Sequence, residues 1–237
     1  MNRQFPALSG LAMLLIVLNH TIEMGTKTPL RYGFAPLEGA PLVILSFVQA
    51  LGFFAVPTFL FISGTFVSYA ARGEPPKLTA KFLTGSVAHI GWPYLFWSAV
   101  FYVLVFVQLG ERYSPKGYVK NLIVGYPFHF IPMLVLCYVV SPLLVRAARR
   151  HALALMAVLG AGQLLLLTLV HTKFLPGGME ILVPPVVGHT LAVWAVYFPL
   201  GLVYGMRTRE LLPWLQRNRW VLLALAIAMF IGGFLAR

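Results

Sequence analysis

Long runs of apolar residues, separated by short polar segments, repeat along the whole chain. A helix needs about 20 predominantly apolar residues to cross the ~30 Å hydrocarbon core of a bilayer. The pattern therefore predicts an all-α protein, a polytopic transmembrane helical bundle of about seven spans. We expect these spans over residues 6–24, 48–71, 87–109, 127–146, 152–171, 188–206 and 219–235. No long polar linker interrupts them, so residues 1–237 are expected to form a single integral membrane domain.

Composition and charge agree with this pattern and exclude a soluble globular domain. Hydrophobic residues make up 59% of the chain and charged residues 10%, and the mean hydropathy is +0.84. The net charge of +12 comes from cations spread among the segments between spans, so no nucleic-acid partner is expected. Cytoplasmic segments of membrane proteins are enriched in Lys and Arg. A cytoplasmic N-terminus places 11 of the 18 cations inside, and this bias predicts that orientation.

One histidine, His20, lies inside the first apolar run, beside Asn19 and one helical turn before Glu23. An ionisable side chain at bilayer depth costs a few kcal/mol or more unless it faces protein or water, which makes His20 a functional candidate. A spacing of three residues puts His20 and Glu23 on one helix face. A carboxylate there would set the tautomer of the imidazole and raise its basicity, as a general base or proton relay requires. The alternative is that Glu23 lies at the water boundary and His20 hydrogen-bonds a neighbouring helix.

The other histidines and the single cysteine add a second expectation. His129, His171 and His189 fall near the predicted outer ends of their spans, on the side where the second half of the first span places His20. They indicate a polar vestibule that reaches His20. No local ligand pattern such as His-Glu-x-x-His is present, so no metal site is expected. Cys137 is the only cysteine, which excludes an intrachain disulfide.

Several stretches of the chain follow the pattern of one known family. Residues 8–20, which end in Asn19-His20, are similar to the family's first helix, and residues 53–64 are similar to its second. Residues 92–97, with the segments that begin at His129 and Tyr138, resemble its third and fourth helices, and residues 198–205 resemble a later one. The family is acyltransferase family 3, the multi-pass membrane acyltransferases that acylate bacterial surface and exported carbohydrates.

This resemblance implies an activity, its co-substrates and a location. A cytoplasmic acyl-CoA would donate an acyl group, usually acetyl, to a hydroxyl or amine of a carbohydrate presented across the membrane. His20 matches the histidine expected to act in transfer, with Glu23 as its orienter. No bound cofactor is expected, and the chain would contact membrane lipid in a bacterial inner or plasma membrane. The residues expected to bind the acceptor are Asn19, His129 and Trp97, and those expected to bind the donor are Lys77, Lys81 and His89.

The chain also departs from the family pattern. The Asp and Arg that precede the histidine in the usual first helix are replaced by Pro6 and Ser9. An Arg-x-x-Arg pair before the third helix is missing from residues 85–93, and only Lys77 and Lys81 lie nearby. These losses motivate an alternative, a non-catalytic member that exports or escorts a lipid-linked or polymeric carbohydrate. Because the family usually has about ten spans, we expect a truncated chain or a reduced member.

Overall fold

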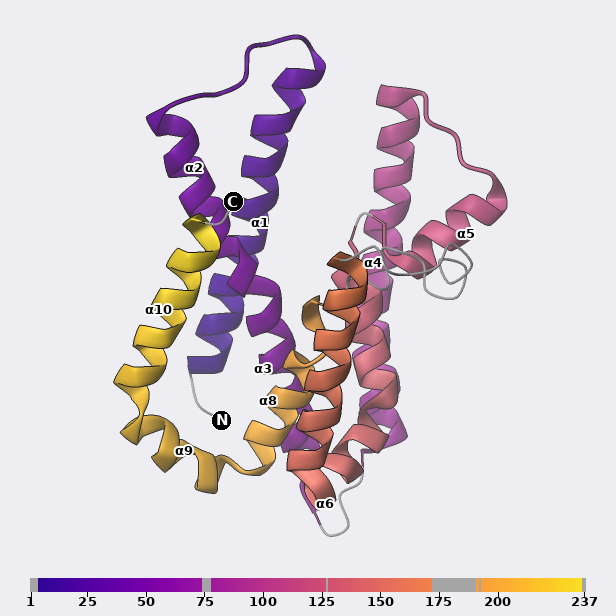
Figure 1. Ribbon diagram of the computed structural model, residues 1–237. Helices are drawn as coiled ribbons and strands as arrows, with labels where there is room; N and C mark the ends of the chain where they lie inside the picture. The colour runs from indigo at the N-terminus through magenta and orange to yellow at the C-terminus, as the bar shows by residue number, and fades with distance from the viewer. Residues whose placement is uncertain (1–3, 74–77, 127, 172–190, 192, 236–237) are drawn as a thin grey trace. The chain divides into compact units, whose positions relative to one another are not determined.

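The computed structural model describes residues 4–73, 78–126, 128–171, 191 and 193–235, and its regular elements there are all helices (Figure 1). The all-α prediction is confirmed. Four helices are long and apolar enough to cross a membrane, and a fifth span results if one bent helix pair counts as a single span. The number of seven spans and the cytoplasmic N-terminus stay predictions. The chain divides into two compact units, Met1–Ile62 with Arg207–Arg237, and Ser63–Met206.

The first unit is built around the N-terminal helix. It contains the helices α1 (Gln4–Arg31), α2 (Ala40–Leu51), the 3-10 turn η1 (Gly52–Phe54), α9 (Thr208–Arg217) and α10 (Arg219–Leu235). α1 packs against α2 and η1. The ring of Phe47 on α2 meets Phe230 and Phe234 of α10 edge-on, with centroids 5.6 and 5.8 Å apart. Apolar ring contacts therefore hold α10 to α2.

The second unit contains the second half of α3 (Ala55–Ala70), which starts in the first unit. Its other helices are α4 (Ala80–Leu109), α5 (Pro115–Val124), α6 (Phe130–His171) and α8 (Tyr197–Met206). Side-chain and backbone caps set the ends of α4. The Thr79 hydroxyl accepts a hydrogen bond from the Phe82 amide, and Gly110 closes the helix with a φ of 67°.

α6 is broken at His151, where φ is −139° and ψ is 52°. In a straight helix Tyr138 and Gln163 would lie about 37 Å apart. Both instead contact the segment at the start of α8. The ring of Tyr138 lies 5.8 Å from that of Phe198, and Gln163 Oε1 accepts a hydrogen bond from the Val196 amide at 2.9 Å. The halves of α6 therefore fold back on each other, which agrees with two predicted helices on either side of this break (Figure 1).

The helices match the predicted ranges unevenly. The predicted range 48–71 overlaps a longer continuous apolar stretch, Ala40–Ala70, which begins eight residues earlier and ends one residue earlier. Pro41 lies in the first turn of α2, where proline is tolerated. The range 188–206 includes residues outside the described part of the chain, and α8 covers its second half. The short helices α5 and α9 were not predicted.

Within the second unit, α3 and α8 approach each other closely at one point. Thr65 Oγ1 donates a hydrogen bond to the Gly201 carbonyl at 3.1 Å. Gly64 faces the backbone of α8 so closely that a Cβ at this position would overlap the carbonyl oxygen of Phe198 and lie 2.9 Å from the amide nitrogen of Leu202. Small residues at such crossings let membrane helices approach closely.

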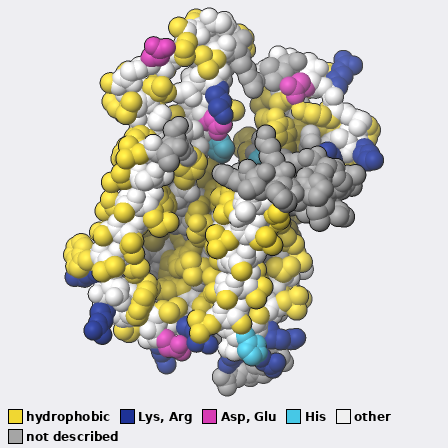
Figure 2. Space-filling view, viewed as in Figure 1, with side chains coloured by type: hydrophobic (Ala, Val, Ile, Leu, Met, Phe, Trp, Pro, Cys, Tyr) yellow, Lys and Arg dark blue, Asp and Glu magenta, His cyan; other side chains and the backbone are white. Residues whose placement is uncertain are grey.

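Many apolar side chains of the long helices are exposed. Figure 2 shows hydrophobic side chains along the helices and charged side chains mostly near helix ends. Leu14 on α1 and Leu153 on α6 have exposed fractions of 68% and 87%. Apolar surface of this extent marks contact with membrane or protein, and with the long apolar helices it identifies a membrane protein.

Candidate functional site

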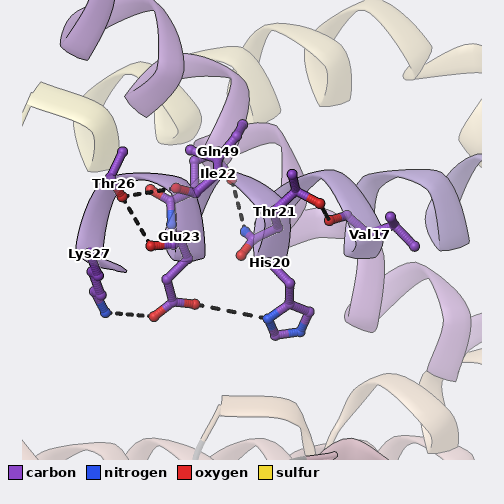
Figure 3. Close-up of polar contacts among 9 residues, drawn as sticks. Val17, His20, Thr21, Ile22, Glu23, Thr26, Lys27 and Gln49 are labelled. Atoms are coloured by element: carbon purple, nitrogen blue, oxygen red, sulfur yellow. Dashed lines mark hydrogen bonds and ion pairs between the residues drawn. The ribbon is translucent and has the colours of Figure 1, made fainter. Parts of the chain in front are cut away.

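His20 and Glu23 lie on one face of α1, as their spacing predicts (Figure 3). His20 Nδ1 is 3.9 Å from Glu23 Oε2. This separation exceeds the 2.7–3.2 Å of a hydrogen bond, so the interaction is electrostatic. The His20 side chain is 67% exposed and that of Glu23 38%. Among the described residues of the first unit, His20 hydrogen-bonds no neighbouring helix, and most of its side chain is left uncovered.

Lys27 is a third member of this face, and the sequence analysis missed it. Its ammonium lies 2.6 Å from Glu23 Oε1, a far shorter distance than the one between Glu23 and His20. The two carboxylate oxygens therefore serve different partners, Oε1 facing Lys27 and Oε2 facing His20 (Figure 3). The spacing of four residues between Glu23 and Lys27 was the available signal, because residues so spaced are neighbours on a helix.

Asn19 connects this face of α1 to the next helix. Its side-chain amide donates a hydrogen bond to the backbone carbonyl of Gln49 on α2, at 3.1 Å. Gly52 in η1 packs directly on the same side chain, and a Cβ there would lie 2.7 Å from the Asn19 Cβ. One amide proton of Asn19 is thus committed to the backbone. The contact holds the helix turn that carries His20.

The remaining predicted acceptor residues belong to the second unit. His129 lies one residue before α6 and is half-buried, with its ring 6.1 Å from that of Tyr126. Its Nδ1 is buried and has no hydrogen-bond partner within the described part of the chain. Trp97 on α4 is 57% exposed and lies edge-on to Phe96, with ring centroids 5.4 Å apart. Trp97 and His129 form no ring contact and no hydrogen bond with each other.

Two of the predicted donor residues lie in the first half of α4. Lys81 and His89 are both exposed and are eight residues apart, about 12 Å along the helix axis. Lys77 lies outside the described residues, as does His189, and nothing is described of the His171 side chain. Of the histidines predicted to line a vestibule, only His20 and His129 have described side chains, and they belong to different units.

Tyrosines surround the segment that leads to His129. The hydroxyl of Tyr94 donates to the Leu122 carbonyl at 2.6 Å and that of Tyr102 to the Tyr126 carbonyl at 2.9 Å, which ties α5 and its following turn to α4. Beyond the end of α4, the Tyr113 hydroxyl donates to Glu111 at 2.7 Å. This hydrogen bond to the carboxylate, more than any other cause, raises the pKa of Tyr113 to about 12, so the phenol stays neutral at physiological pH.

No group of three or more His, Cys, Asp or Glu side chains with metal-binding placement occurs among the residues that the structure describes.

Comparison with known proteins identifies a family that matches nearly the whole chain. The model of acyltransferase family 3, described as an acyltransferase domain, matches residues 7–237. No curated protein and no solved structure matches the chain. The matched range contains His20, Glu23 and Lys27.

Proposed function

The chain belongs to acyltransferase family 3, and from this membership we propose that it transfers an acyl group, most simply acetyl, from acyl-CoA to a hydroxyl or amine of a surface or exported carbohydrate. The family match over residues 7–237 is the observation that carries the proposal. The accessible His20 beside Glu23 adds the chemical group that acyl transfer needs. The site would operate in a bacterial inner or plasma membrane, within a bundle of seven spans and a cytoplasmic N-terminus.

In the proposed reaction, His20 takes the proton of the acceptor as its oxygen or nitrogen attacks the thioester carbonyl. The tetrahedral intermediate collapses, the carbon–sulfur bond breaks, and the proton on His20 passes to the departing CoA thiolate. Glu23 lies nearer to Nδ1, which favours a proton on that nitrogen and leaves Nε2 as the basic atom. Asn19 would donate a hydrogen bond to the developing oxyanion with its second amide proton.

The proposed substrate contacts lie in the second unit. Lys77, Lys81 and His89 would attract the phosphates of CoA from the cytoplasmic side, where the proposed topology places the start of α4. Trp97 and His129 would contact the carbohydrate, the first by stacking and the second through its buried, unpartnered Nδ1. The commoner use of an exposed tryptophan is in the aromatic belt at the membrane interface.

A non-catalytic role in carbohydrate export or escort is the second candidate. It is favoured by Pro6 and Ser9 in place of charges, and by the missing arginine pair in residues 85–93. The position of Glu23, closer to Lys27 than to His20, also fits a protein in which the histidine is not activated.

Acyl transfer from labelled acyl-CoA by purified protein, normalised to folded protein, tests the proposal. General-base catalysis contributes about 10²–10⁴-fold, so we expect His20→Ala to lose about 100-fold or more and Glu23→Gln to lose less. Thr21→Ala is a matched control, because within the described residues this exposed neighbour hydrogen-bonds only the Val17 carbonyl of its own helix. Activity retained in His20→Ala would contradict the catalytic assignment. A wild type that exports carbohydrate without acyl transfer would support the second candidate.

A further inference from the structure

α9 differs from the other helices in both direction and composition. A break at Asn218 separates α9 from α10, and the direction of the chain changes by 76° between the two helices (Figure 1). α10 consists of 17 residues that are almost all apolar, with Arg219 at its start. Where α10 follows the membrane normal, a helix bent by 76° from it lies close to the membrane plane.

The two sides of α9 have opposite character. Leu211, Leu212, Trp214 and Leu215 follow the spacing of one helix face. Arg209, Gln216 and Arg217 fall on the opposite side. The apolar face is only partly covered, since Leu212 is 40% exposed and Trp214 55%. Short helices with leucine and tryptophan on one side and arginine on the other are typical of helices that lie in a membrane interface.

Basic side chains are concentrated on and beside α9. Arg207 lies 3.3 Å from Glu210, the single carboxylate of the segment 207–220. Arg209 and Arg217 form no ion pair with any carboxylate in the described part of the chain, and both are exposed. Arg219 places its guanidinium 5.2 Å from the ring centre of Trp220, at the start of α10. The segment therefore carries exposed positive side chains beside a partly exposed apolar face.

We propose that α9 is an interfacial helix that binds anionic phospholipid head groups. Its apolar face enters the boundary between head groups and acyl chains, while Arg209 and Arg217 contact lipid phosphates from the polar face. The charge is complementary, because anionic lipids attract basic residues that lie beside a membrane span. The proposal does not depend on acyl transfer, and it gives α9 a lipid partner of stated chemistry.

Lipid selectivity of the full chain is the first test. Detergent-purified protein is mixed with phosphatidylglycerol and phosphatidylcholine, and the bound lipids are counted by native mass spectrometry. We expect retention of phosphatidylglycerol over phosphatidylcholine, and a loss of this preference of about tenfold in Arg209→Gln/Arg217→Gln. The matched control Lys116→Gln/Lys120→Gln removes the same charge from α5 and should keep the preference. No preference in wild type, or an equal loss in the control, would overturn the proposal.

Depth in the bilayer is a second and independent test. Trp214→Cys and Gln216→Cys, each in a Cys137→Ser background, place a fluorophore about 200° apart around α9. In vesicles with brominated acyl chains, we expect stronger quenching at position 214 than at position 216. Equal quenching, or stronger quenching at 216, would show that the apolar face does not enter the lipid. This readout stands even if the double arginine variant does not insert.

Discussion

Asn19 and His20 are neighbours on α1, and the contacts of the first hold the second in place. The hydrogen bond from Asn19 to Gln49 and the close approach of Gly52 attach this turn to α2 and η1. Because His20 itself bonds no neighbouring helix of the first unit within the described residues, its position depends on this attachment. The packing of Asn19 against α2 and η1 can therefore control the position of His20, in addition to the hydrogen bond that Asn19 would donate in the proposed reaction.

Gly52→Ala tests this dependence. The new Cβ would lie 2.7 Å from the Asn19 Cβ, and neither atom can rotate away because both are bonded to the backbone. We expect a loss of stability of about 1–3 kcal/mol, seen as a lower melting temperature, together with lower turnover. Gly10→Ala, with no atom within 4 Å of its new Cβ, is the matched control. Recovery of the melting temperature in Gly52→Ala/Asn19→Gly would confirm the clash, and an unchanged melting temperature in Gly52→Ala would contradict it.

Lys77 and Lys81 have two competing roles, and one variant separates them. If they bind CoA phosphates, Lys77→Ala/Lys81→Ala weakens acyl-CoA binding, and the difference from wild type shrinks at high salt because exposed charges are screened. If they act only as topology signals, the variant changes insertion instead. Binding is measured on protein of verified topology by isothermal calorimetry. Unchanged affinity in correctly inserted protein would eliminate the donor role.

The residue scale also shows what spacing can and cannot predict. The pairing of His20 with Glu23 follows from a separation of three residues, and the same rule applied four residues onward yields Lys27. The bond from Asn19 to Gln49 joins residues 30 apart in the sequence. Such a contact depends on how α1 and α2 pack, which no local spacing contains.

At the scale of helices, the crossing of α3 and α8 depends on backbone contact. Gly64→Ala would place a Cβ against the Phe198 carbonyl and 2.9 Å from the Leu202 amide nitrogen, so a helix has to move. We expect the free energy of unfolding to fall by about 1–3 kcal/mol, because the shift also weakens the hydrogen bond from Thr65 to the Gly201 carbonyl. Thermal unfolding of purified protein measures this loss. Gly160→Ala on α6 meets no atom within 4 Å and should be neutral or gain up to about 1 kcal/mol. Equal melting of both variants would argue against the close crossing.

The length of apolar runs explains which helices the sequence predicts. α1 and α4 contain long apolar runs, so they are predicted directly. α5 and α9 have 10 residues each and mix polar with apolar positions, so a criterion of about 20 apolar residues misses them. The break in α6 lies at His151, after Arg149 and Arg150, and this basic cluster divides the two predicted ranges.

At the scale of the molecule, a hydrogen bond from Arg149 connects two basic segments. Arg149 Nη1 donates to the Gly73 carbonyl at 2.8 Å, so the break in α6 lies beside the segment that precedes α4. α5 lies toward the other end of the second unit, because Phe130 and Arg149 are 19 residues apart, about 29 Å along α6. This length is close to the ~30 Å of the hydrocarbon core. We therefore expect the two segments to share one membrane side, opposite to α5.

Cysteine labelling in intact cells tests both the arrangement and the orientation. In a Cys137→Ser background, Lys116→Cys reports on α5 and Arg150→Cys on the break in α6. The proposed cytoplasmic N-terminus puts the basic cluster inside. An impermeant thiol reagent should therefore label Lys116→Cys at once and Arg150→Cys only after the cytoplasm is opened. The reverse pattern would invert the orientation and keep the arrangement, whereas labelling of both from one side would contradict the placement of α5 and the α6 break on opposite sides of the membrane.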